Sequence, residues 1–321
     1  MLDALAGRYV AIVLGTVLWD VGAILQKRAV SRMPQGRLPV IALLRSPGWM
    51  LGLLVTTAGW GIFVYGLDKV PISAARTITA GSYVVLAVFS LIFLREPLSL
   101  AEWLALAGVT LGIVMLGLQE RPAASPIVPS ADKVLIGIAC MSFLAVVAFI
   151  LRQLLKSSSR ARVVSLFAFA ALSGLLGSVG DLLTKVLLAL VQKAPAAPLL
   201  VLTAAGLISF YVTGFYMLSR AYQFGTVVGG IVVSDFFGRV GALFLGSLVL
   251  AEPIGGPGSG GLLRAFGFLL VLVGSLFLGR FAAGSKTGRS EGGRGHGWPG
   301  GRPKTGRSEG GRGRPGSSAP P

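Results

Sequence analysis

The sequence is poor in the residues from which most catalytic and metal centres are built. Its single cysteine, Cys140, allows no disulfide and no thiolate metal site within one chain. Its single histidine, His296, lies in the C-terminal tail, which excludes a histidine-based catalytic or metal site inside a membrane. Charged residues make up 13% of the chain, whereas a soluble domain carries about 25%. These shortages argue against a soluble enzyme.

Long apolar runs take the place of the missing charges. Hydrophobic residues form 54% of the chain and the mean hydropathy is +0.79. Several runs approach the roughly 20 residues that cross a bilayer as a helix. We therefore predict an all-α polytopic membrane protein whose first run is a retained helix and not a cleaved signal. The nine expected spans are roughly 9–29, 49–67, 74–95, 101–118, 133–152, 163–187, 199–220, 226–250 and 261–280.

The basic residues are unevenly distributed between the joints of these spans. The first joint carries a cluster from Lys27 to Arg45, the fifth a cluster from Arg152 to Arg162, and the C-terminal tail is basic throughout. Lys and Arg favour the cytoplasmic side of a membrane. An odd number of spans places all three regions on that side, so we predict that the N-terminus is outside and the C-terminus inside. The expected location is the plasma (inner) membrane of a prokaryote.

Three short segments recur in the same order along the chain. "VGAILQK" at 21–27 returns as "VGDLLTK" at 179–185, "FLREPLS" at 93–99 as "VLAEPIG" at 249–255, and "LGIVMLG" at 111–117 as "VGSLFLG" at 273–279. Proline disfavours helical geometry in the residue before it, so each Glu-Pro is expected to end a helix. The first four spans thus correspond to the last four.

The fifth span has no counterpart, so the second set of four enters the membrane in the opposite sense to the first. We predict two inverted four-helix repeats, at 9–118 and 161–283, joined by a linking helix and its loops at 119–160. Residues 1–8 form the outer N-terminal end and residues 284–321 a basic tail. Inverted repeats place a substrate site near the midplane and allow alternating access.

The tail, residues 284–321, repeats "KTGRSEGGRG" at 286–295 and 304–313. Its composition predicts disorder. We favour a tail that contacts anionic lipid over one that binds nucleic acid.

This arrangement resembles a known family. Four spans, a linking span and four more spans, with "LREP" and "LAEP" closing the third helix of each repeat, are similar to the drug/metabolite transporter superfamily. The nine spans, the outside N-terminus, "GSYVVLAVFSLIFLREPLS" and "ALSGLLGSVGDLLTK" most resemble the NIPA-type magnesium transporters, with EamA-type permeases second. The resemblance covers about residues 9–281 and implies a transporter.

Four charged residues are singled out because they lie away from the basic clusters at the span ends and inside the expected spans, where such groups are costly in lipid and typically functional. Asp20 lies halfway along the first span, and the alternative to a cavity-facing site is a structural carboxylate. Asp235 and Arg239 are four residues apart and can pair on one helix face, either as a site or as a structural ion pair. Asp181 stands inside the repeated heptad, where a solvated helix end is the alternative.

Other polar residues complete the candidate site. Lys27 is expected to extend to the cytoplasmic interface as an anchor. Glu96 and Glu252, with their prolines, are expected to be helix-end markers and not substrate ligands. The candidates for substrate or coupling-ion binding are Asp20, Asp181, Asp235, Arg239, Thr16, Thr79, Tyr83 and Tyr216, those for a metal are Asp20 and Asp235, and the helix-end motifs are Glu96, Pro97, Glu252 and Pro253.

The first functional hypothesis is a secondary transporter that works by alternating access, with Asp20 as the titrating or substrate-binding group. Mg²⁺ is the first candidate substrate, and protons are a candidate coupling ion. The alternatives are an exporter of amino acids, metabolites or cationic drugs, and a non-transporting membrane scaffold. We expect no enzyme activity and no cofactor. The expected partners are the lipid bilayer, the transported solute and, as an open question, a second copy of the chain.

Overall fold

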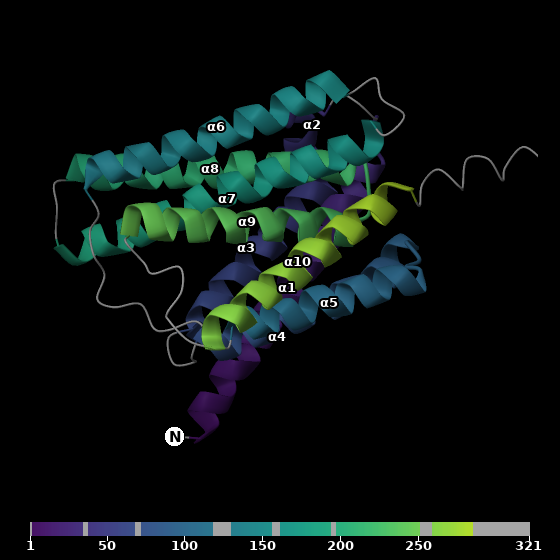
Figure 1. Ribbon diagram of the computed structural model, residues 1–321, viewed down its shortest axis with the longest axis horizontal. Coiled ribbons are helices and arrows are strands. Elements are labelled where there is room, and N and C mark those ends of the chain that lie inside the picture. The colour runs from purple at the N-terminus through teal and green to yellow at the C-terminus, as the bar shows by residue number, and fades with distance from the viewer. Residues whose placement is uncertain are drawn as a thin grey trace, which may run out of the picture.

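The computed structural model describes residues 2–34, 38–67, 72–117, 130–155, 161–193, 197–250 and 259–284, and every regular element within these ranges is helical (Figure 1). The elements are α1 (Leu2–Ser31), α2 (Val40–Leu44), α3 (Pro47–Leu67), α4 (Ile72–Phe89), the π-helical turn η1 (Ser90–Leu94), α5 (Leu100–Gly117), α6 (Ala131–Leu155), α7 (Ala161–Lys193), α8 (Ala197–Tyr222), α9 (Val227–Leu250) and α10 (Ser259–Gly284). The predicted all-α class is confirmed.

Among the residues that the structure describes, six helical segments are long and apolar enough to cross a membrane. They are Ala6–Ser31, Pro47–Gly66, Ala131–Leu155, Ala161–Val191, Pro198–Tyr222 and Val227–Val249, and three shorter apolar segments are Gly81–Leu94, Leu100–Leu116 and Ala265–Phe281. α6 and α8 expose large apolar side chains such as Phe143 and Leu202. Outward-facing apolar side chains suit lipid as the surrounding solvent. An integral membrane protein is therefore supported, while nine crossings and their orientation stay predictions.

The helices fall into two sets with the same pattern of contacts. In the first set α1 packs on α3 and α4, and α4 packs on α5; in the second α7 packs on α8 and α9, and α9 packs on α10. α6 packs on α7 and α9. Figure 1 shows α6, α7, α8 and α9 side by side, while α10 crosses obliquely towards α5. The two sets meet along α5 and α10 and where α4 and α1 approach α9.

The largest apolar core lies between the two sets. Leu86 and Ala87 of α4 join Ile24 of α1 and Val228 and Val232 of α9 in one buried cluster. Because this cluster combines side chains from both sets, any movement of one set against the other must rearrange it. The polar groups described below are embedded at its margin.

Glycine sets the close approach of α5 and α10. A Cβ atom added to Gly112 would lie 2.6 Å from the carbonyl oxygen of Gly267, and one added to Gly267 would lie 3.0 Å from that of Gly112. Gly108, one turn before Gly112, would meet nothing within 4 Å. Only the second glycine of this GxxxG segment therefore permits helix packing.

Gly112→Ala is expected to lower the free energy of unfolding by roughly 1–3 kcal/mol because its methyl group would force α5 and α10 apart. Gly108→Ala is the matched control and should leave stability unchanged or slightly higher, since alanine favours helix. Reversible unfolding in detergent micelles measures both values. Equal effects of the two substitutions would contradict this packing.

Candidate functional site

Asp20 lies at the contact of α1 with α4. The residue is 6% exposed, and its Oδ2 atom has no hydrogen-bond partner. The side chain of Ser82 on α4 is its hydrogen-bonding neighbour, yet the Ser82 hydroxyl also donates to the carbonyl oxygen of Thr79 at 2.9 Å. Thr16, one turn away, donates to the carbonyl oxygen of Ile12 at 2.6 Å. A buried carboxylate oxygen without a donor is costly, so this position has a capacity for a ligand that the protein itself leaves unused.

Tyr222 contributes a second such oxygen near by. Its ring is fully buried at the end of α8, and its hydroxyl also has no hydrogen-bond partner. Asp20 and Glu96 are the charged neighbours of this hydroxyl. Two buried, unpartnered oxygen atoms and two carboxylates thus occupy one part of the interior, where oxygen donors suit a proton, a water molecule or a hard cation.

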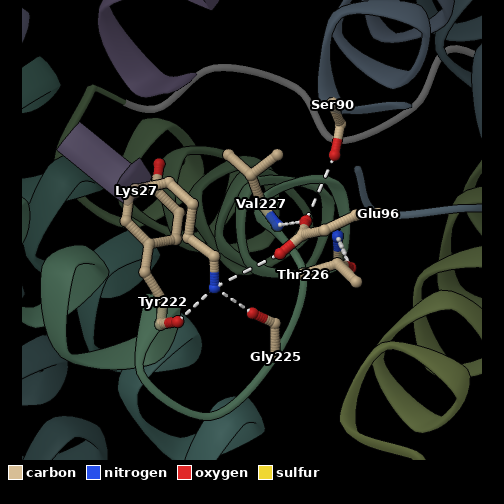
Figure 2. A network of polar contacts seen from close by, with 8 residues as sticks. Lys27, Ser90, Glu96, Tyr222, Gly225, Thr226 and Val227 are labelled. Carbon is tan, nitrogen blue, oxygen red and sulfur yellow. Dashed lines mark hydrogen bonds and ion pairs between the residues drawn. The ribbon is translucent and has the colours of Figure 1, made fainter. Parts of the chain in front are cut away.

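Lys27 closes one end of this polar interior (Figure 2). Its side chain is fully buried, and the Nζ atom donates to the carbonyl oxygens of Tyr222 and Gly225. The same ammonium lies 3.7 Å from Oε1 of Glu96. The expectation of a lysine that extends to the membrane interface is therefore wrong. The oxygen atoms of the α8–α9 turn and of Glu96 replace the water that an interfacial lysine would seek.

The local backbone directs Glu96 towards this lysine. The π-helical turn η1 ends at Arg95, whose left-handed conformation (φ 53°) reverses the chain. The Ser90 hydroxyl donates to Oε2 of Glu96 at 3.1 Å, and the backbone N–H of Val227 donates to the same oxygen at 3.1 Å. Helix N-termini stabilise anions through free N–H groups and the macrodipole. Glu96 follows the end of its own helix as expected, and it also binds the start of α9.

Thr226 completes the start of α9. Its hydroxyl accepts from the N–H of Gly229 at 3.2 Å, which is the geometry of a helix N-cap. Trp49 of α3 donates through Nε1 to the Ser219 hydroxyl at 3.0 Å in the adjoining last turn of α8. The α8–α9 turn is thus anchored from three directions, by α1, η1 and α3.

Asp235 and Arg239 form the predicted pair on α9, with 2.6 Å between Oδ2 and Nε. Tyr83 of α4 is buried beside them, and both charged groups are neighbours of its hydroxyl. The Glu-Pro alignment assigns Thr79 and Tyr83 to the positions of Asp235 and Arg239 in the first repeat. Equivalent positions of the two sets therefore meet in space.

The remaining candidates lie elsewhere. Asp181 on α7 is exposed and accepts a hydrogen bond from the Tyr211 hydroxyl at 2.7 Å. Tyr216 donates to the carbonyl oxygen of Leu38 at 2.9 Å, which ties α8 to the segment before α2. Glu252 and Pro253 lie outside the described residues.

A site rich in metal-ligating side chains is not formed by the part of the chain that the structure describes. No group of three or more His, Cys, Asp or Glu side chains there could hold an ion. Asp20 and Asp235 stay individual candidates, with Asp235 already engaged by Arg239. The residues that sequence reasoning missed are Lys27 and Tyr222. A lysine and a Glu-Pro recur at equivalent positions of the two repeats. This recurring pair of opposite charges is the sequence signal that points to an ion pair of Lys27 with Glu96.

The comparisons with known proteins identify a class of membrane transporter. Residues 40–118, which extend from α2 to just beyond α5, match the EamA-like transporter family. The expected resemblance to the drug/metabolite transporter superfamily is confirmed, and this segment carries it. No solved structure matches the chain significantly.

Three curated relatives are more particular. The chain is 23% identical over 277 residues to the probable magnesium transporter NIPA9 of Arabidopsis thaliana. The aligned residues cover 81% of this chain and 78% of that protein. It is 32% identical to the uncharacterized transporter YwfM of Bacillus subtilis over 71 residues, 22% of this chain and 24% of that protein. It is 28% identical over 96 residues to the probable 4-amino-4-deoxy-L-arabinose-phosphoundecaprenol flippase subunit ArnE of Aeromonas hydrophila, 30% of this chain and 84% of that protein. These are transporters or a flippase subunit, so a transporter role is supported and the expectation of no enzyme is confirmed.

Proposed function

We propose that the protein is a secondary transporter that moves Mg²⁺ across the membrane by alternating access, with Asp20 as the central carboxylate of the pathway. The observation that carries the proposal is the buried Oδ2 atom of Asp20, which has no partner in a helix of membrane-spanning length. Two opposite-facing four-helix sets would provide the moving halves. The repeated pattern of helix contacts and the α4–α9 and α5–α10 contacts between equivalent helices support this symmetry.

The oxygen chemistry around Asp20 favours a hard cation. Mg²⁺ retains several of its waters and is typically bound through one or two carboxylates. Asp20 supplies one such carboxylate, and it is a charged neighbour of the buried Tyr222 hydroxyl group. The similarity to a probable magnesium transporter over most of the chain gives independent support. The proposed orientation places the N-terminus outside and the C-terminus inside, in the plasma membrane of a prokaryote.

An exporter of a zwitterionic or cationic organic solute is the second candidate. The Asp235–Arg239 pair next to Tyr83 presents both charges beside an aromatic ring, a set that can bind the two ends of an amino acid. The EamA-like match over residues 40–118 is compatible with either substrate class.

Transport by purified protein in proteoliposomes separates the two candidates. Mg²⁺ uptake and efflux, followed with a fluorescent indicator inside the vesicles, should exceed the flux of empty vesicles. A panel of amino acids and cationic drugs should give no comparable flux. Flux of an organic solute without Mg²⁺ flux would replace the cation with the second candidate.

A further inference from the structure

Lys27 connects the two helix sets at one end of the molecule. Its stem belongs to α1 in the first set, while the two carbonyl oxygens that it binds belong to the α8–α9 turn of the second. Glu96, from the end of η1 in the first set, binds both this ammonium and the N-terminus of α9. One buried cluster of charged hydrogen bonds therefore holds the two sets together (Figure 2).

These contacts are specific to one relative position of the sets. A buried ammonium needs close oxygen partners to offset its lost hydration. If α9 moved away from α1, Lys27 would lose both carbonyl oxygens and Glu96 would lose the N–H of Val227. The end of the molecule at Lys27 can open only when this cluster breaks and its charges regain water.

The equivalent position in the second set is exposed, whereas Lys27 is buried. Lys185 takes the place of Lys27 in the repeated heptad. It is exposed and lines a cleft between α7 and α9 with Asp181, Ala242 and Gly246. Gly246 corresponds, through the Glu-Pro alignment, to Ser90 of the Lys27 cluster. The same two positions thus form a sealed cluster at one end and border a cleft at the other.

We infer that Lys27 and Glu96 form a latch that seals the Lys27 end of the transport pathway in this conformation and opens when the pathway turns to face that end. The inference rests on the alternating-access part of the proposed function and adds its gate. In any one conformation of an inverted-repeat transporter, equivalent positions of the two repeats have different surroundings. Breaking the latch should therefore shift the population towards the state that is open at Lys27.

Thiol accessibility tests the latch without any substrate. In a Cys140→Ser background, Val228→Cys reports on the Lys27 end, because Val228 is fully buried beside Val227. Ala242→Cys reports on the cleft at Lys185. A water-soluble maleimide should modify the second thiol rapidly and the first slowly in otherwise unchanged full-length protein in micelles.

Lys27→Met should raise the equilibrium constant for opening at Lys27 about a hundredfold, which corresponds to ~2.8 kcal/mol. The modification rate of the Val228→Cys thiol should then rise about fiftyfold. The Ala242→Cys thiol should then react about twofold more slowly, because such a shift brings a minor state of about 1% to half of the population. Lys185→Met is the matched control and should not raise the rate at Val228. Glu96→Gln provides a second, milder break of the latch should Lys27→Met fail to fold.

Two results would overturn the latch. Unchanged reactivity at Val228 in Lys27→Met and Glu96→Gln would show that the cluster does not seal this end. Faster reaction at Val228 without slower reaction at Ala242 would show local loosening and not an exchange of open ends. If both expected changes in thiol reactivity occur but no Mg²⁺ flux is measured, the latch is supported and only the choice of Mg²⁺ as substrate is overturned.

Discussion

Asp20→Asn is expected to abolish most Mg²⁺ flux while leaving the protein folded. The amide keeps the size of the side chain but removes the charge that would attract a divalent cation. Truncating one partner of a buried charge pair typically costs roughly 2–5 kcal/mol, which lowers apparent affinity by about 30-fold or more. Because Oδ2 has no partner within the protein, the neutral side chain should cost little stability. Loss of transport with retained stability distinguishes a transport site from a structural carboxylate.

The matched control is Asp132→Asn. Asp132 is an exposed carboxylate in the first turn of α6. Its substitution removes the same charge at a distance from the polar interior. Flux is measured in proteoliposomes over a range of Mg²⁺ concentrations, and thermal unfolding in micelles checks the fold. Unchanged flux in Asp20→Asn would refute the central role of this carboxylate. A large loss of stability without any loss of flux per folded molecule would assign it a structural role.

The helices were predictable because their signals are local. Eight of the nine expected spans fall within one α-helix, give or take one residue at an end, and the span 74–95 covers α4 and η1. Apolar runs and Gly/Pro-rich joints define both the spans and the helices. Asp20 was also predictable, because a carboxylate in the middle of an apolar run has few alternatives to burial. Local sequence was sufficient wherever burial alone decides the structure.

The burial of Lys27 and its backbone partners were not predictable, for two physical reasons. A lysine two residues from a predicted helix end has the same sequence pattern whether its side chain extends to water or turns inwards. Two of its partners are backbone carbonyl oxygens, 195 and 198 residues away in the chain, and these have no side-chain signature. The π-helical turn that directs Glu96 is likewise invisible in the apolar run "SLIFL". Long-range polar contacts of this kind require the tertiary fold.

The Asp235–Arg239 pair should have the largest effect on stability. Asp235→Asn leaves a guanidinium whose side chain is only 14% exposed without its carboxylate. Removing one member of a fully buried ion pair costs roughly 3–5 kcal/mol, because the remaining charge is desolvated without compensation. This pair is partly buried, so its loss should lie towards the lower end of that range. Arg239→Gln should be similarly costly, although its partner is more exposed, at 30%. Tyr83 cannot replace either charge, since its hydroxyl is neutral.

The double variant Asp235→Asn with Arg239→Gln separates the pair from its surroundings. Neither charge remains, so it should be more stable than either single variant, and the double-mutant cycle should give a clear coupling energy. Unfolding in mixed micelles of increasing denaturing detergent measures all four proteins. Additive losses would mean that the two charges act independently. Restored stability with lost organic-solute flux, in turn, would mark the pair as a binding site, because a purely structural pair can be replaced by neutral groups without any effect on transport.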